Sequence, residues 1–123
     1  MRFWLLCLLV GCEDSDSAPK TFSTLYADVL SPSCGFSSCH GGGAGAPFFG
    51  DEQTAYDSLV DAESSGAEGE VLVRPGDADN SYLILKLEDA EGIVGDAMPP
   101  STSIDEERIG WLREWIDAGA SRD

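Results

Sequence analysis

The segment CGFSSCH, from Cys34 to His40, places two thiols and the single histidine of this 123-residue chain within one short stretch. A glycine-rich run, GGGAG at positions 41–45, follows it directly. Thiolate and imidazole groups are cofactor and metal ligands. We therefore expect this stretch to decide how the chain folds and what chemistry the folded domain supports.

Three interpretations of the stretch are open. Covalent c-type haem requires two thiols that reach two vinyl groups and a histidine directly after the second thiol, usually as CxxCH. Here four residues separate the thiols, but the relation of Cys39 to His40 is the usual one. A Cys34–Cys39 disulfide would explain the thiols and leave the histidine unexplained. A zinc site would need a recruited fourth ligand, and copper is a further alternative.

The N-terminal residues MRFWLLCLLVG predict export. Arg2 precedes an apolar stretch that is too short to span a bilayer as a helix. The sequence LVGC, ending at Cys12, resembles the lipobox of bacterial lipoproteins, which implies cleavage before Cys12 and its acylation. We expect residues 1–11 to be a lipoprotein signal peptide, residues 12–20 an acylated cysteine with a flexible tether, and residues 21–123 one domain.

This assignment determines which cysteines keep their thiols and where the chain resides. Cys7 would leave with the signal peptide and Cys12 would carry lipid, so Cys34 and Cys39 alone would act in the folded domain. We expect a lipid-anchored protein of the bacterial cell envelope, facing the periplasm or the outer surface.

The hydrophobic pattern predicts a small all-α domain. In TFSTLYADVL, apolar residues recur at helical spacing from Phe22 to Leu30, with Thr21 as the cap and Pro32 as the end of the helix. A second helix is expected over residues 52–60, capped by Asp51. No strand-like alternation and no internal repeat is present.

Two further helices are expected in the C-terminal half. DADNSYLILKLED predicts a helix capped by Asp77 or Asn80. Ser103 and Glu106 form a capping box that predicts the start of the last helix. Gly119 stands where a helix C-cap belongs.

The chain is strongly acidic, with 23 Asp and Glu residues against 7 Lys and Arg residues and a formal net charge of −16. Such a surface repels nucleic acid and anionic lipid head groups. We expect no nucleic-acid partner, and contact with the membrane through the N-terminal lipid only. A solvated acidic surface, or a protein partner with a basic docking patch, fits the charge.

Four sequence blocks resemble one family. VLSPSCGFSSCHGGG, VRPGDADNSYLILKL, AMPPS and LREWIDAGA follow one another from Val29 to the end of the chain. In order and spacing they are similar to the small cytochrome c domains of planctomycete and myxobacterial exported proteins, which are class I-like c-type cytochromes. The four-residue spacing between the thiols departs from that family's usual form.

The resemblance implies a cytochrome c-like fold, with the N- and C-terminal helices packed against each other beside a covalent haem c and long loops around it. It assigns Cys34 and Cys39 as thioether carriers, His40 as one axial iron ligand and Met98 as the other. Pro47 would offer its carbonyl to His40. The composition agrees on the second ligand, because Met98 is the one methionine left after signal removal and no second histidine is available.

A His/Met pair favours electron transfer because it leaves the iron no open position for substrate. We therefore expect single-electron exchange with redox protein partners, and no enzymatic activity. The rest of the chain offers no nucleophile elbow and no phosphate-binding glycine pattern. The alternative is a haem-free envelope lipoprotein, a binding or structural module stapled by a Cys34–Cys39 disulfide.

Overall fold

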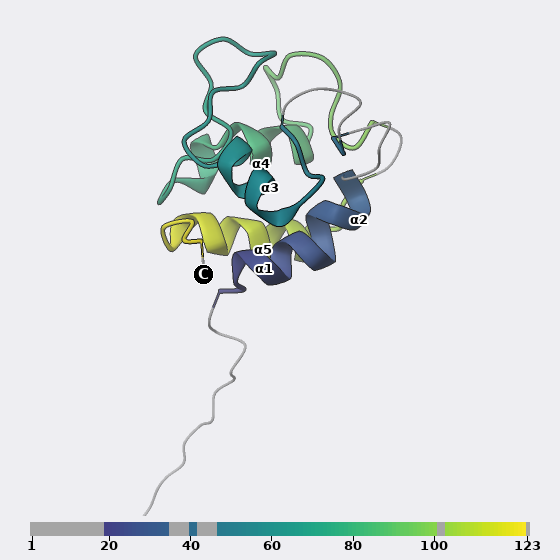
Figure 1. The fold of residues 1–123 in the computed structure, drawn as a ribbon. Helices are drawn as coiled ribbons and strands as arrows, with labels where there is room; N and C mark the ends of the chain where they lie inside the picture. The colour runs from purple at the N-terminus through teal and green to yellow at the C-terminus, as the bar shows by residue number, and fades with distance from the viewer. Residues whose placement is uncertain (1–18, 35–39, 42–46, 101–102, 123) are drawn as a thin grey trace, which may run out of the picture.

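The computed structural model describes residues 19–34, 40–41, 47–100 and 103–122. In this part of the chain the fold is a small, mostly helical domain built from four helical segments, with no strands (Figure 1). None of its helices is long and apolar enough to cross a membrane. The all-α prediction is therefore confirmed at the level of fold class.

The first helical segment is longer than predicted. It consists of α1 (Phe22–Leu25), a π-helical turn (Tyr26–Leu30) and α2 (Ser31–Cys34). The Thr21 side chain accepts a hydrogen bond from the backbone of Thr24, as expected for the cap. The prediction that Pro32 ends the helix is wrong.

The π-helical turn accounts for this difference. The backbone N–H of Ser31 bonds to the carbonyl of Tyr26, five residues back, so the hydrogen-bond register shifts just before the proline. Proline clashes with the carbonyl four residues earlier and lacks a donor in a regular α-helix. The register shift lies directly before the proline, and the helix continues to Cys34.

The second helix, α3 (Glu52–Leu59), matches its prediction. The Asp51 carboxylate accepts hydrogen bonds from the Thr54 backbone at 2.8 Å and the Thr54 hydroxyl at 3.0 Å. These bonds favour the charged carboxylate and lower the pKa of Asp51. After α3 the chain pairs locally through isolated bridges, Val60 with Val73 and Glu63 with Val71.

The third helix begins with a different cap from the two predicted. A 3₁₀ turn (Ala78–Asn80) leads into α4 (Tyr82–Leu87), and Ser81 is the N-cap. The Asp77 side chain instead accepts a hydrogen bond from the Asn80 amide. The buried Ser81 hydroxyl accepts from the Arg74 backbone and donates to the Asp77 carbonyl, so it ties the turn to the preceding segment.

The last helix, α5 (Glu106–Asp117), is capped by Asp105, and the predicted Ser103 capping box is wrong. The Asp105 carboxylate accepts from the Arg108 backbone and also pairs with the Arg108 guanidinium at 2.7 Å, an extra interaction that serine could not make. At the other end Gly119 has φ of +115°, as predicted for a C-cap glycine. Its N–H bonds to Ile116 and that of Ala120 to Trp115, which is the Schellman pattern.

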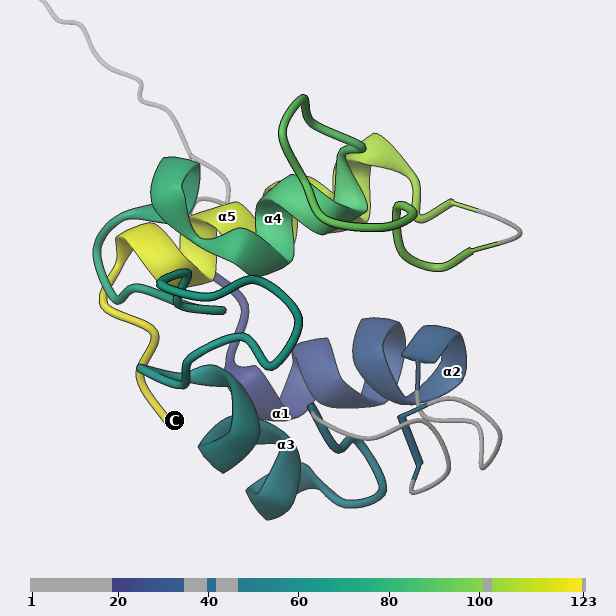
Figure 2. The same ribbon diagram turned by 90° about the horizontal axis from the view of Figure 1, so that it is seen from above.

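The core lies where α1, α3 and α5 meet. The Phe22 ring lies 5.1 Å from the Trp115 ring and 5.2 Å from the Tyr56 ring. The Tyr56 hydroxyl donates to the Ala120 carbonyl and so holds the C-terminus against α3. The N-terminal and C-terminal helices therefore pack against each other, and α4 packs on another face of α5 (Figures 1 and 2).

Candidate functional site

One cavity brings together three residues that were predicted to form the site. Cys34, His40 and Met98 all line a hollow of about 280 Å³, and Pro47 lines it with them. Figure 2 shows from above the end of α2, which carries Cys34, and α4, which forms another wall. Cys39 and Cys12, the other two predicted site residues, lie outside the described residues.

The backbone holds Cys34 and His40 next to each other. Cys34 is buried at the end of α2, and its carbonyl accepts a hydrogen bond of 3.0 Å from the His40 N–H. The His40 carbonyl accepts from the Phe49 N–H at 2.5 Å, and the Phe49 carbonyl accepts from the Tyr26 hydroxyl at 2.8 Å. His40 is therefore connected on both sides to the first helical segment.

The imidazole of His40 lies against an aromatic ring. Its centroid is 5.5 Å from that of Phe49, with an angle of 61° between the ring planes. Edge-to-face contacts of this kind restrict how a ring can turn. The predicted contact between the Pro47 carbonyl and His40 stays a prediction.

Apolar side chains form most of the cavity wall. They come from the loop after His40, from the extended piece before α4, from α4 itself and from the loop that follows it: Phe49, Leu72, Leu83, Leu87 and Val94. An apolar wall with a few converging ligand groups is typical of cofactor sites. The cavity therefore suits a largely apolar group that is held by sulfur and nitrogen ligands.

Met98 reaches the cavity at the end of a loop, residues 88–98, that follows α4. It is half-buried, and its N–H donates to the Lys86 carbonyl at 2.9 Å. The peptide bond that joins it to Pro99 is cis. The structure thus places the thioether on the same cavity as the thiol and imidazole, although it lies far away in the sequence.

Two cavity residues on α4 were not predicted. Tyr82 and Lys86 line the hollow and also bind the loop that carries Met98. The sequence did contain a signal for these two residues, because Lys86 is a lone cation in the apolar run YLILKL and follows Tyr82 by one helical turn. The course of the loop, which shows what these side chains bind, could not be read from the sequence.

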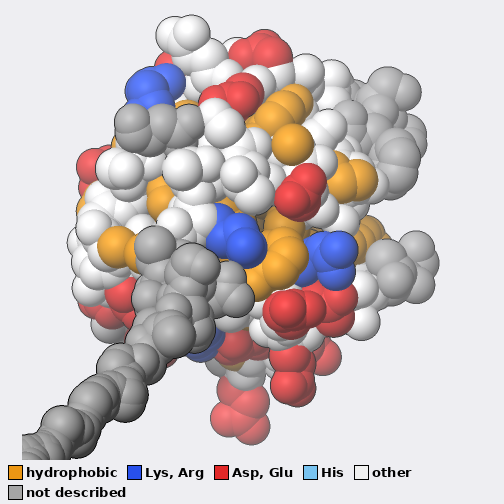
Figure 3. All heavy atoms as spheres, turned by 90° about the horizontal axis from the view of Figure 1, so that it is seen from below, with side chains coloured by type: hydrophobic (Ala, Val, Ile, Leu, Met, Phe, Trp, Pro, Cys, Tyr) orange, Lys and Arg blue, Asp and Glu red, His pale blue; other side chains and the backbone are white. Residues whose placement is uncertain are grey.

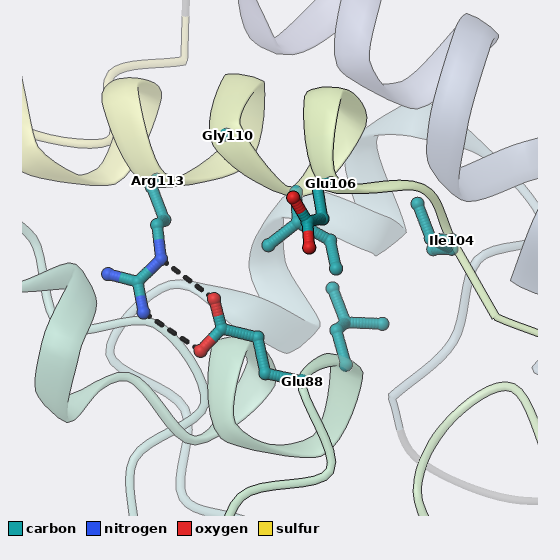
Figure 4. A pocket seen from close by; sticks show the side chains of 7 residues that line it. Glu88, Ile104, Glu106, Gly110 and Arg113 are labelled. Carbon is teal, nitrogen blue, oxygen red and sulfur yellow. Dashed lines mark hydrogen bonds and ion pairs between the residues drawn. The ribbon is translucent and has the colours of Figure 1, made fainter.

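A larger hollow of about 500 Å³ lies between α4 and α5, but it contains none of the predicted ligands. Figure 4 shows that Arg113 of α5 reaches across it to Glu88, with bonds of 2.9 and 3.0 Å. Glu88 and Asp79 raise the pKa of Arg113 through these hydrogen bonds, so the guanidinium stays charged. This hollow is a bridged groove between two helices, and the smaller cavity is the candidate site because sulfur and imidazole groups meet there.

The Arg74 side chain lies apart from the cavity. Its guanidinium donates to the Asn80 carbonyl and lines a separate surface hollow. In the part of the chain that the structure describes, no three His, Cys, Asp or Glu side chains gather in a group that could hold a metal ion.

Comparison of the chain with protein-family models, with curated proteins and with solved structures finds no match in any of the three.

Proposed function

We propose that the cavity binds a covalent haem c and that the protein transfers single electrons in the bacterial cell envelope. One observation carries the proposal: the thiol of Cys34 and the imidazole of His40, from one short stretch, and the thioether of Met98, from a distant loop, line the same largely apolar cavity. These are the groups that hold c-type haem. Copper can take the same three ligand types, and the second thiol, Cys39, directly before His40 favours haem c over copper.

The chain's residues would hold the group as follows. Cys34 and Cys39 would each add a thiol across one vinyl group, which forms one C–S bond and one C–H bond and requires no oxidant. His40 and Met98 would ligate the iron on its two faces. Bound in this way, haem supplies an iron that alternates between the ferric and ferrous states and so carries one electron.

The environment of these residues supports transfer rather than catalysis. With His40 and Met98 both bound to the iron, a bound haem would leave no iron position for a substrate. The thioether and the apolar walls at Leu72, Leu83 and Leu87 would favour the less charged, ferrous state and raise the reduction potential.

The surface charge indicates the kind of partner. The net charge of −16 favours redox proteins with a basic docking patch. On the face seen in Figure 3, acidic side chains gather beside basic groups and an apolar patch. Lys20 and Arg108 lie over the Trp111 ring, at 4.7 and 5.5 Å.

Attachment at Cys12 would keep the protein at the membrane, where it would meet redox proteins of this kind.

The decisive experiment is to export the full chain from a bacterial host that has haem-ligation machinery. We expect the purified protein to gain the mass of one haem, to keep haem-dependent peroxidase staining on a denaturing gel, and to show sharp reduced-minus-oxidised visible bands. The matched control is Cys34→Ser with Cys39→Ser, which should lose the covalent stain. The wild-type chain emerging without porphyrin mass would refute the proposal.

The same sample tests the alternative. A colourless protein whose mass is two hydrogens below that of the chain with both thiols reduced would contain a Cys34–Cys39 disulfide. That result would favour the haem-free lipoprotein, in which the disulfide staples a binding or structural module.

A further inference from the structure

The loop that carries Met98 is fastened to α4 by two side chains one turn apart. The Tyr82 hydroxyl accepts a hydrogen bond from the Val94 N–H at 2.7 Å. The Lys86 ammonium donates to the carbonyls of Val94 and Asp96 at 2.8 and 2.5 Å. Together with the bond from the Met98 N–H to the Lys86 carbonyl, these contacts hold residues 94–98 along α4.

The loop is shaped to meet the ammonium group. Gly95, between the two accepting carbonyls, has φ of +76°, a conformation that glycine adopts without strain. A side-chain carbon at Gly95 would lie 3.8 Å from the Lys86 Nζ atom, so the turn passes close to the ammonium. Two carbonyls on either side of the turn therefore converge on one cation.

Lys86 differs in what it binds from the three arginines that form ion pairs, and it resembles Arg74, which also donates to a backbone carbonyl. In the described part of the chain, the ion pairs are made by Arg108, Arg113 and Arg122, each with carboxylates. The Lys86 ammonium donates to backbone carbonyls, although the chain is rich in acids. Charged donors form stronger hydrogen bonds than neutral ones.

Residues 94–96, in the middle of this stretch, have few apolar contacts, whereas Ile93 and Met98 on either side pack against the core. Val94 is 55% exposed, and Asp96 is exposed as well. Segments with few buried apolar contacts open more readily than the core. Residues 94–96 therefore depend on their polar contacts with α4, a helix whose Leu83 and Leu87 also form the cavity wall.

We infer that Lys86 is a positioning residue that keeps the Met98 thioether on the cavity and closes the second iron position to outside ligands. This inference rests on the proposed function. Loss of the ammonium would raise the fraction of molecules in which the loop is open. An outside ligand competes with Met98 in that fraction, so its apparent affinity rises in the same proportion.

The experiment uses the oxidised holoprotein and imidazole as the competing ligand. Lys86→Leu keeps most of the apolar stem, removes the donors and adds no new ligand. We expect it to raise imidazole affinity by about tenfold or more and to weaken the long-wavelength absorption band of sulfur-ligated ferric haem. Lys86→Arg, which keeps the charge and the donors, should restore most of the wild-type behaviour.

The matched control is Lys20→Leu, which makes the same change at the chain's other lysine, beside Trp111. It should leave imidazole affinity and the absorption band unchanged. Hydrogen exchange adds a readout that is independent of the iron, because the Met98 amide should exchange faster in Lys86→Leu than in Lys20→Leu.

The outcomes separate this inference from the proposed function. A holoprotein whose Lys86→Leu variant has wild-type imidazole affinity, absorption and Met98 amide exchange would overturn the role of Lys86 alone. A wild-type chain without covalent porphyrin would overturn the proposed function, and the inference with it.

Discussion

The two ends of this domain are built in different ways. Where α1, α3 and α5 meet, buried rings contact one another and each helix begins or ends with a specific cap. At the cavity, the proposed ligand residues His40 and Met98 lie outside the helices and are held by backbone and side-chain hydrogen bonds. The helical end therefore provides stability, and the cavity end provides chemistry at positions that the helices fix.

The difference has a thermodynamic consequence. Burial of aromatic surface contributes several kcal/mol per side chain, whereas a solvent-accessible hydrogen bond contributes about 1 kcal/mol. Substitutions at the helical end should therefore change the free energy of unfolding. Those at the cavity end should change the spectrum and the potential more than the stability.

The largest effect is expected for Trp115→Ala. Trp115 is 3% exposed, packs on Phe22 and donates to the Ser121 carbonyl. Its removal should lower the free energy of unfolding by about 3–5 kcal/mol, measured by denaturant titration. Trp111→Ala, on the same helix but half-buried, should cost markedly less. Equal losses in the two variants would show that the aromatic cluster is not the stabilising end.

Met98→Ala should have the largest effect at the cavity end. We expect haem to stay covalently attached, the sulfur-to-iron absorption band to disappear, and the reduction potential to fall by on the order of 0.1 V or more. Potentiometric titration followed by visible absorption measures both. Glu91→Gln, in the same loop but exposed and not among the residues that line the cavity, is the control and should change neither. Persistence of the band in Met98→Ala would mean that Met98 is not the ligand.

Two glycines, Gly110 inside α5 and Gly119 just after it, should change the stability in opposite directions when each is replaced by alanine, and by less than Trp115→Ala does. Gly119→Ala places a side chain at φ of +115° and should destabilise the protein by about 1 kcal/mol. Gly110→Ala, inside the helix with open space around it, should stabilise the protein by up to about 1 kcal/mol. Thermal unfolding of both variants tests this, and effects of the same sign would contradict the role of Gly119 as the helix terminator.

The smallest expected effect is the pH dependence of the stability that the Asp51 cap contributes to α3. Because the folded-state pKa of Asp51 is lowered, its charge stabilises the fold above the ordinary carboxyl value of 3.8 and loses that contribution as the pH falls through the folded-state value. Asp51→Asn keeps a capping side chain that does not titrate. The stability difference between wild type and Asp51→Asn should therefore change only in the acidic range, and a difference that is constant down to acid-unfolding conditions would contradict the assignment.

Local signals predicted the helices well and their exact ends less well. The α3 cap at Asp51 and the α5 stop at Gly119 were predicted because each depends on a few neighbouring residues. The cap of α5 was misplaced because Ser103 and Asp105 both suit the position, and the additional pair with Arg108 decides between them. The continuation through Pro32 was missed because a π-helical turn has no clear sequence signal.

The sequence predicted which residues with ligand-type side chains form the candidate site, and it did not predict which side chains hold the Met98 loop in place. The sequence identified Cys34, His40 and Met98 from the side chains that haem ligation requires, and the structure places all three on one cavity. The roles of Tyr82 and Lys86 depend on the path of the loop that follows α4. That path is set by tertiary contacts, which no local pattern contains.

The hydrogen bonds that tie His40 to Phe49, and Phe49 to Tyr26, would have a consequence for the rate of the proposed electron exchange. Gain or loss of an electron is fast when the surrounding atoms need little rearrangement between the two oxidation states. An imidazole whose backbone is bonded on both sides, and whose ring rests on Phe49, has little freedom to rearrange. The domain would therefore combine a small reorganisation energy at the histidine with a more adjustable loop at the methionine.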